Sequence, residues 1–479
     1  MPKVKYNSTD HLYIQVSRGI EKLIEDEVLL IGDKLPSVRV LSEEYGISMG
    51  TAFQAYYHLE GRGLIESRPK SGYYVRYNNK RFFLLPQPLQ PDATSHEVSV
   101  KEMIASIYKD IAAPDGMNFA LAVPDPSLLP SAKINKSVLF ALRNGKNHCI
   151  NYEDTQGSAD LRKEIVKLSF NWGGKIKHND IIITLGCLDA ITMCLRAVTK
   201  HGDTVAVESP TYFGILQAIE SLGLKVVEIL SDPETGIDLE HLQKAIKKYN
   251  LKACVVIPNF NNPMGSCMPD DKKKDLVELI TKNKLPLIED DIYGELYFGR
   301  HRPKPCKYYD TAGLVMYCCS LSKSLSPGYR IGWAIVGNFF EEVNQMKRIQ
   351  NISCPTITQA AMAHFLKTGR YEYHLKTLRK ALHTQSLRYV QAIMKYFPAD
   401  TKVSRPSGGF ILWLELNEKV NAFKLHTEAM KQNISIVPGN IFTSGNHYTN
   451  CIRISFGKLW SEDVEYGLMT LGKLIKKMI

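Results

Sequence analysis

The sequence predicts an α/β protein in which a small helical unit precedes a large domain with a mostly parallel sheet and a smaller C-terminal α/β subdomain. Two observations predict this class. Residues 11–61 carry three helical patterns and are followed by two short strand patterns. Beyond residue 180, short β-branched runs alternate with longer helical patterns, which is typical of a parallel sheet that helices cover on both faces.

The composition is that of a globular protein, with 479 residues of which 44% are hydrophobic and 23% are charged. This length corresponds to about three domains of roughly 150 residues each. Lys+Arg 60 against Asp+Glu 49 gives a formal charge of +11. Such an excess suits a partner or ligand that carries phosphate, but it also suits an ordinary solvated surface.

Two absences in the sequence bear on location and metal binding. No run of about 18 apolar residues and no signal-peptide pattern occurs, so we expect a cytoplasmic protein that neither crosses a membrane nor is exported. The ten cysteines lie between Cys149 and Cys451 without a C-x-x-C pair. This spacing is typical of reduced thiols and predicts neither a disulfide framework nor a metal site.

The first elements expected are three helices and a hairpin. An amphipathic helix covers residues 11–30, Ser37 can cap a second short helix, and Ser48 can cap a third. Two short strands, 64–67 and 72–76, flank a turn. Three helices followed by a hairpin form the layout of a winged helix-turn-helix.

Basic residues cluster at the end of this unit. Between residues 62 and 81 there are six Lys or Arg residues and only Glu66 as an acid, a local excess of +5. Residues 1–61 carry six basic and nine acidic residues, so the positive charge is confined to the hairpin and the segment after it.

Several motifs make this unit similar to the winged helix of GntR-type bacterial regulators. They are Leu12-Tyr13-Ile14-Gln15, Leu35-Pro36-Ser37-Val38-Arg39, Gly46-Ile47-Ser48, Ala55-Tyr56 with Leu59-Glu60, and Ser71-Gly72-Tyr73. The resemblance implies a double-stranded DNA operator as partner. The residues that it places on DNA are Arg39, Ser48, Thr51 and Gln54 at the duplex and Arg68 and Lys70 on phosphates.

One departure from that family concerns the third helix, where Met49-Gly50 stands in place of a common basic residue. Base readout is therefore expected to be weaker or differently placed. The alternative interpretation of the whole unit is a helical module that serves only oligomer contacts.

The large region follows a proline-containing linker at about residues 82–99. Its expected strands are 181–184, 204–208, 225–229, 253–257, 285–289 and 314–318, with further strands at 410–416 and 451–455. Ligands collect at the carboxyl ends of parallel strands, so we expect one pocket where these ends meet. The polar residues just past the ends are Gly186, Tyr212, Asn262, Asp290 and Ser320 to Lys323.

These residues fit the chemistry of pyridoxal 5′-phosphate. This cofactor needs an amine, which Lys323 offers, a carboxylate for its pyridine nitrogen, and donors for its phosphate. The segment from Ser320 to Arg330 surrounds the lysine with hydroxyl groups and one arginine, as a phosphate site requires. The alternative is a lysine that faces solvent from a loop.

Residues 115–479 resemble the fold-type I pyridoxal phosphate enzymes of the aspartate aminotransferase family. The shared motifs are Ser-x-Ser-Lys-x-x-x-Pro-Gly-x-Arg at 320–330, Asn-Pro-x-Gly at 262–265, Asp-x-x-Tyr at 290–293, Tyr152-x-x-x-x-Gly157-x-x-x-Leu161-Arg162 and Gly408-Gly409-Phe410-x-x-Trp413. The resemblance implies a fold-type I, PLP-dependent transferase domain with pyridoxal 5′-phosphate as its cofactor.

The same resemblance implies a role for each residue of the pocket. Lys323 and Asp290 would be catalytic, with Asp290 paired to the pyridine nitrogen. Asn262 and Tyr293 would hold the ring hydroxyl, and Tyr212 would lie against the ring. The residues implied in phosphate binding are Gly186, Cys187, Ser320, Ser322 and Arg330.

Two further roles lie at the rim of the implied site. Arg453, together with Asn262, would bind the carboxylate of a substrate or effector. Tyr152 would reach the phosphate of a partner subunit, which implies a homodimer. Met264 and Leu188 depart from the Thr and Gln that are common in the family, so the edge of the pocket is expected to differ.

The whole chain is similar to MocR-type regulators, in which a GntR-type winged helix precedes an aminotransferase-like domain. The similarity implies a regulator that senses an amino compound through a lysine Schiff base. The alternatives are a working aminotransferase with a secondary winged helix and a sensor of pyridoxal phosphate itself. The expected domains are 1–78 (winged helix-turn-helix), 79–114 (linker and lead-in), 115–340 (large domain) and 341–479 (small subdomain).

Overall fold

The computed structural model describes residues 11–25, 28–29, 32–68, 71–76, 85–89, 91, 95–97, 116–144 and 150–479. Its contacts divide the chain into two compact units. The smaller unit is Met1–Leu84 with Leu387–Lys395, and the larger unit is Leu85–Ser386 with Tyr396–Ile479. The finer division at residues 78, 114 and 340 stays a prediction.

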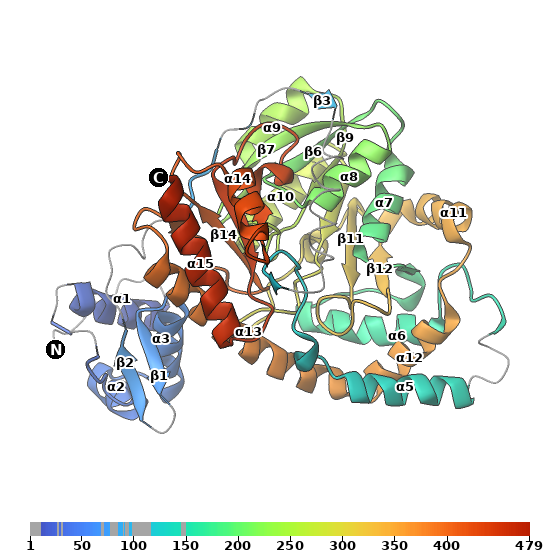
Figure 1. Ribbon diagram of the computed structural model, residues 1–479. Helices are drawn as coiled ribbons and strands as arrows, with labels where there is room; N and C mark the ends of the chain where they lie inside the picture. The colour runs from blue at the N-terminus through green and yellow to red at the C-terminus, as the bar shows by residue number, and fades with distance from the viewer. Residues whose placement is uncertain are drawn as a thin grey trace. The chain divides into compact units, whose positions relative to one another are not determined.

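The smaller unit contains the three helices and the hairpin that the sequence predicts (Figure 1). Ser37 and Ser48 cap the second and third helices by accepting hydrogen bonds from the N–H groups of Val40 and Thr51. Gly46 ends the second helix in the left-handed region. The elements are α1 (Leu12–Glu25), α2 (Val38–Tyr45), α3 (Met49–Gly61), and the antiparallel strands β1 (Ile65–Arg68) and β2 (Gly72–Val75).

One hydrophobic core holds this unit together. α1 and α2 both pack on α3. The hydroxyl of Tyr56 donates a 2.7 Å hydrogen bond to the carbonyl of Pro36, which ties α3 to the segment before α2. The core is made of side chains from every element, among them Val16, Ile20, Leu41, Ala52, Tyr56, Leu59, Ile65 and Val75.

The larger unit is built on a nine-stranded sheet in the order β3-β7-β6-β9-β10-β11-β12-β5, with β8 paired to β7. The strands from β7 to β11 run parallel, and all six predicted strands are present. The prediction missed β12, which runs antiparallel to both of its neighbours. The strands are β3 (His96–Glu97), β5 (Ile181–Thr184), β6 (Thr204–Ser209), β7 (Lys225–Asp232), β8 (Gly236–Ile237), β9 (Leu251–Val256), β10 (Leu287–Asp290), β11 (Val315–Ser320) and β12 (Gly332–Ile335).

Helices cover both faces of this sheet (Figure 1). In β6, Val205 and Val207 enter the core beneath α7 and α8, whereas Ala206 enters the core beneath α9 and α10. Such strands are apolar on both sides, which confirms the predicted fold class. The helices are α7 (Cys187–Val198), α8 (Phe213–Ser221), α9 (Leu239–Lys248) and α10 (Asp270–Lys282).

A second, antiparallel sheet lies in the C-terminal part, in the order β13-β14-β17-β16. The predicted strands at 410–416 and 451–455 are β14 and β17. A short parallel pair, β4 with β15, fixes residues 117–118 to this part. The elements are β4 (Met117–Asn118), β13 (Lys402–Val403), β14 (Ile411–Glu415), α14 (Ala422–Met430), β15 (Ile434–Ser435), β16 (Val437–Pro438), β17 (Cys451–Ser455) and α15 (Glu462–Met478).

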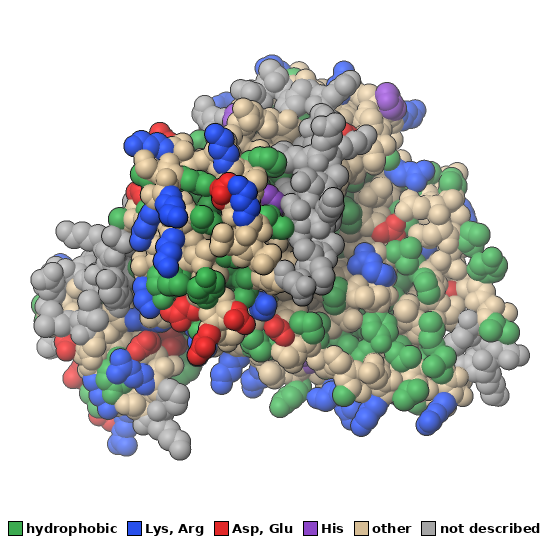
Figure 2. Space-filling view, in the orientation of Figure 1, with side chains coloured by type: hydrophobic (Ala, Val, Ile, Leu, Met, Phe, Trp, Pro, Cys, Tyr) green, Lys and Arg blue, Asp and Glu red, His purple; other side chains and the backbone are tan. Residues whose placement is uncertain are grey.

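In the larger unit the helices α5 and α12 lie side by side (Figure 1). Figure 2 shows hydrophobic side chains gathered over this region, and Leu139, Phe140 and Leu142 of α5 are exposed. Among the described helices, none has the length and apolar character that a membrane crossing requires. The remaining helices are α5 (Ser131–Asn144), α6 (Ala159–Ser169), α11 (Phe340–Asn351), α12 (Thr356–Lys367) and α13 (Arg370–Tyr396), of which residues 387–395 belong to the smaller unit.

Candidate functional site

A cavity of about 220 Å³ lies at the carboxyl ends of the parallel strands. The loops after β5, β6, β9, β10 and β11 all reach it, as the topology of a parallel sheet favours. The structure therefore brings together most of the predicted cofactor and substrate residues. Those that line the cavity are Cys187, Tyr212, Asn262, Asp290, Tyr293, Ser322, Lys323, Arg330 and Arg453.

Lys323 follows β11 and its partly buried side chain lines the cavity. Its Nζ donates a 2.6 Å hydrogen bond to the carbonyl oxygen of Ala122. Burial and then the charge of Arg453 lower the pKa of the amine to about 8, although Asp290 opposes them. Near neutral pH a much larger fraction of such an amine is neutral than of an ordinary lysine. The position holds an amine that can act as a nucleophile near neutral pH.

Asp290 is the last residue of β10 and is 4% exposed. The thiol of Cys187 and the N–H of Ile292 both donate to its Oδ1, each at 3.1 Å. Burial raises its pKa to about 6, so the carboxylate is largely ionised at pH 7. Within the described ranges no group donates to Oδ2. This oxygen is left to accept a hydrogen bond from a ligand.

Arg330 lies beside the start of α7. Its guanidinium donates to the carbonyl of Leu185 at 2.7 Å and to the hydroxyl of Ser322 at 3.4 Å. A Cβ at Gly186, which has a φ of 103, would collide with this guanidinium, so only glycine allows the close approach. Gly186 also offers no side chain to cap the first N–H groups of α7. An arginine beside free helix N–H groups suits a phosphate.

Arg453 lies in β17 and is 2% exposed. It donates to the side-chain oxygen of Asn262 at 3.4 Å and to the carbonyl of Ala120. Tyr293 faces the same cavity, and burial raises the pKa of its hydroxyl. Together with Lys323 and Arg330, Arg453 gives the cavity more positive than negative charge, which suits a ligand with two anionic groups.

Three predicted residues lie elsewhere or act differently from the expectation. Ser320 is buried at the end of β11, lines a different small cavity, and accepts a hydrogen bond from the N–H of Ser322 at 3.3 Å. Tyr152 is 83% exposed and does not line the cavity of its own chain. The thiol of Cys187 donates a hydrogen bond to Asp290, so this thiol is not available to a phosphate as the resemblance implied.

One wall of the cavity was not predicted from the sequence. Residues 120–122 line it, and the carbonyls of Ala120 and Ala122 accept from Arg453 and Lys323. They reach the cavity because β4 pairs with β15 more than 300 residues later along the chain. Backbone carbonyls leave no motif, so no sequence signal marks this wall.

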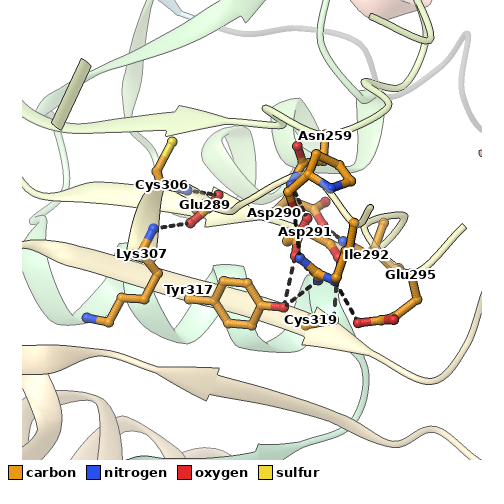
Figure 3. A network of polar contacts seen from close by, with 12 residues as sticks. Asn259, Glu289, Asp290, Asp291, Ile292, Glu295, Cys306, Lys307, Tyr317 and Cys319 are labelled. Atoms are coloured by element: carbon orange, nitrogen blue, oxygen red, sulfur yellow. Dashed lines mark hydrogen bonds and ion pairs between the residues drawn. The ribbon is translucent and has the colours of Figure 1, made fainter. Parts of the chain in front are cut away.

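Next to Asp290, Asp291 belongs to a different network of polar contacts (Figure 3). Its carboxylate accepts hydrogen bonds from Arg302 at 2.6 Å, Tyr317 at 2.9 Å and Asn259 at 2.8 Å. The side chains of Arg302 and Asp291 are 1% and 0% exposed. Both oxygens of Asp291 accept hydrogen bonds, whereas Asp290 keeps one acceptor oxygen for a ligand.

In the smaller unit, the predicted DNA contacts of α2 and α3 lie on its surface. Arg39 is exposed on α2 and pairs with Glu43 at 3.1 Å. The hydroxyls of Ser48 and Thr51 are 2.8 Å apart at the start of α3. Gln54 follows on α3 and is partly exposed.

The predicted phosphate contact of the hairpin is Arg68, at the end of β1. Its Nε donates to Glu66 at 2.8 Å, and its guanidinium lies 4.2 Å from the centre of the Tyr74 ring. Lys70 lies outside the described residues. No cluster of His, Cys, Asp and Glu that could hold a metal ion occurs in the described part of the chain.

Comparisons with known proteins agree with both units. Residues 119–471 match the family model "Aminotransferase class I and II", and residues 12–75 match "Bacterial regulatory proteins, gntR family". Two relatives from Escherichia coli strain K12 are named uncharacterized HTH-type transcriptional regulators. YdcR is 36% identical over 98% of this chain and 99% of its own, and YjiR is 34% identical over 97% and 98%.

A solved structure supports the fold of the larger unit. It is LysN, an alpha-aminoadipate aminotransferase from Thermus thermophilus in complex with N-(5'-phosphopyridoxyl)-L-leucine. It aligns with a TM-score of 0.73 and 27% identity over 79% of this chain and 95% of its own. The chain therefore belongs to the MocR-type family, in which a GntR-type winged helix is fused to an aminotransferase class I and II domain.

Proposed function

We propose that the chain is a DNA-binding transcriptional regulator whose aminotransferase-like domain senses an amino compound. The observation that carries this proposal is that one chain contains both a winged helix with exposed Arg39 and Arg68 and a cavity that holds a partly buried amine of lowered pKa. The full-length relatives named as HTH-type transcriptional regulators support it.

The cofactor is pyridoxal 5′-phosphate, and the residues of the cavity fit it. When bound, it supplies an aldehyde that condenses with a primary amine and a ring that accepts electrons. Lys323 would provide the attaching amine, and Asp290 would hold a proton on the pyridine nitrogen through its free Oδ2. Asn262 and Tyr293 would hold the ring hydroxyl.

The two anionic ends of cofactor and effector would be held by separate groups. Arg330, Ser322 and the first N–H groups of α7 at Gly186 and Cys187 would bind the phosphate, with Ser320 supporting the loop. Arg453 would bind the carboxylate of the amino compound, and Tyr212 would lie against the cofactor ring. The geometry of the cavity and the family resemblance support these roles.

A homodimer in the cytoplasm is the assembly that we propose. The exposed position of Tyr152 supports it, because a residue that serves a partner's phosphate has to lie outside its own cavity. Exposed apolar side chains on α5 offer a surface for a second copy. Dimer formation is tested by light scattering of the full chain, and a monomer at all concentrations would contradict it.

Absorption spectroscopy tests the cofactor site. The purified full chain should be yellow, or become so with added pyridoxal 5′-phosphate, and the band should vanish in Lys323→Ala and in Lys323→Arg. Lys323→Arg is the matched variant because it keeps a cation in the cavity but cannot condense with an aldehyde. A colourless wild type that cannot be reconstituted would overturn the cofactor site.

DNA binding tests the regulatory role. The full chain should bind duplex DNA from its own upstream region with an affinity that falls as salt increases.

A second candidate function is a working aminotransferase, which the joint presence of Lys323, Asp290 and Arg453 in one cavity favours. Rapid multiple turnover of an amino acid with a keto acid, without DNA binding, would replace the regulator with this enzyme.

A further inference from the structure

The outward face of α3 carries large apolar side chains. Met49 is 52% exposed and Phe53 is 48% exposed. A spacing of four residues places them on the same face of the helix. The core of the unit uses the neighbouring face, about a quarter turn around the helix, through Ala52, Ala55, Tyr56 and Leu59. These two side chains leave an apolar surface near the start of α3 that the core of the unit does not use.

The same helix carries no cation. Residues 46–61 contain neither Lys nor Arg, and burial lowers the pKa of His58. Glu60 lies at the far end of α3 and accepts a 2.9 Å hydrogen bond from the N–H of Ser67. The helix therefore lacks the arginine and lysine side chains that read guanine in the major groove.

Exposed arginine side chains of this unit lie on other elements than α3. Arg39 on α2 and Arg68 at the end of β1 are both largely exposed. Cations outside the reading helix can hold the phosphates on either side of a groove, while the neutral face of α3 meets the base edges. This charge pattern favours a nucleic acid over an apolar protein partner as the occupant of the face.

We infer that α3 reads A·T base pairs, with Phe53 and Met49 against the 5-methyl groups of thymine and Gln54 within reach of adenine. The inference rests on the proposed DNA-binding function and adds to it the base composition of the operator. Apolar contact is how proteins recognise the thymine methyl, and glutamine can bridge the acceptor and donor positions of adenine. Gln54 lies about 100° around the helix from Phe53, so α3 presents an amide beside the apolar pair.

Replacing thymine by deoxyuridine tests this, because the exchange removes only the methyl group. Preferred sites are first selected from a random duplex pool with the full chain loaded with pyridoxal 5′-phosphate. Each thymine of a selected site is then replaced in turn. We expect the selected sites to be rich in A·T pairs. Each replacement of a contacted thymine should lower the affinity about fourfold, which corresponds to the free energy of burying one methyl group.

Variants of the face complete the test. Phe53→Ala should bind the thymine and deoxyuridine duplexes with more nearly equal affinity, and Phe53→Leu, which keeps an apolar side chain, should retain part of the discrimination. Leu12→Ala is the matched control, because Leu12 is 47% exposed on α1, and it should discriminate like the wild type.

Equal affinity of the wild type for both duplexes, or selected sites rich in G·C, would overturn the inference while the proposed function stands. A change of oligomeric state in Phe53→Ala without a change in discrimination would assign the face to a protein contact and also overturn it. If the full chain selects no duplex at all, the inference and the DNA-binding function both fail.

Discussion

The cavity of the larger unit and the outer surface of the winged helix hold their functional groups in opposite ways. In the cavity, Asp290 and Arg453 are 4% and 2% exposed, and backbone groups fix their positions. On the winged helix, the side chain of Arg39 is 80% exposed and its partner is a neighbouring acid of the same helix. These side chains of the cavity are already held in place by contacts within the protein. The exposed side chains of the DNA surface have to leave their present ion pairs before they can contact DNA.

This difference sets the size of the effects that substitutions produce. Removing one partner of a buried ion pair leaves a desolvated charge, which costs about 3–5 kcal/mol. An exposed pair such as Arg39 with Glu43 contributes about 0–1 kcal/mol, so DNA can displace it at little cost. The cavity should therefore respond to substitution strongly and locally, and the DNA surface weakly and with salt dependence.

The largest effect is expected at Asp291, beside the cavity. Asp291→Asn leaves Arg302 buried with only Glu295 as an acidic partner and should lower the free energy of unfolding by about 3 kcal/mol. Urea unfolding followed by circular dichroism measures this. Asp290→Asn is the matched control and should lose far less stability, because Asp290 pairs with no buried cation in this way. Equal losses in both variants would contradict the distinction between the two carboxylates.

Asp290→Asn should instead impair the chemistry of the cavity. We expect the single-turnover reaction of bound cofactor with an added amino acid to slow by about a hundredfold, because the amide cannot keep the pyridine nitrogen protonated. Stopped-flow absorption measures the rate. If this variant reacts at the wild-type rate, Asp290 does not have the proposed role at the pyridine nitrogen.

The pH dependence of cofactor attachment follows from the lowered pKa of Lys323. Only the neutral amine attacks an aldehyde, so the attachment rate should rise with pH up to about pH 8, by roughly tenfold per unit well below that value, and then level off. Arg453→Met removes a cation that lowers this pKa and should move the profile to higher pH. A wild-type profile that still rises beyond about pH 9, or a variant whose profile does not move, would contradict the assigned cause.

A smaller effect is expected at Arg39 of the winged helix. Arg39→Ala should weaken binding to the selected duplex about tenfold. Glu43→Gln should strengthen it slightly, because it frees Arg39 from its ion pair. Fluorescence anisotropy titrations measure both. Weaker binding by Glu43→Gln would show that the pair orients Arg39 instead of competing with DNA.

The smallest effect is expected at Arg68. Arg68→Ala should weaken binding to specific and random duplexes by a similar, few-fold factor and reduce the slope of log affinity against log salt by about 1. Titrations at several salt concentrations measure this slope. A loss confined to the specific site would instead assign Arg68 to base readout.

Sequence patterns predicted the strands that end in the cavity because each is a run of apolar residues followed by a polar one. They missed β12, since Gly332-Trp333-Ala334-Ile335 has only one β-branched residue and directly follows the loop of Lys323 and Arg330. The wall at residues 120–122 depends on pairing with a strand at 434–435, and such long-range pairing has no local signature. The different contacts of Asp290 and Asp291 also have no local signature, because Arg302, Tyr317 and Asn259 reach Asp291 from other parts of the chain.

The measurement that tests the coupling of the two units most directly is the affinity of the full chain for its selected duplex with and without amino compounds. Anisotropy titrations are run on the cofactor-loaded wild type and on Lys323→Ala, each with and without a mixture of α-amino and ω-amino acids. We predict that the mixture changes the Kd of the wild type by about fivefold or more and leaves that of Lys323→Ala unchanged. An unchanged Kd of the wild type, or an equal change in Lys323→Ala, would contradict a regulator that senses amines through this lysine.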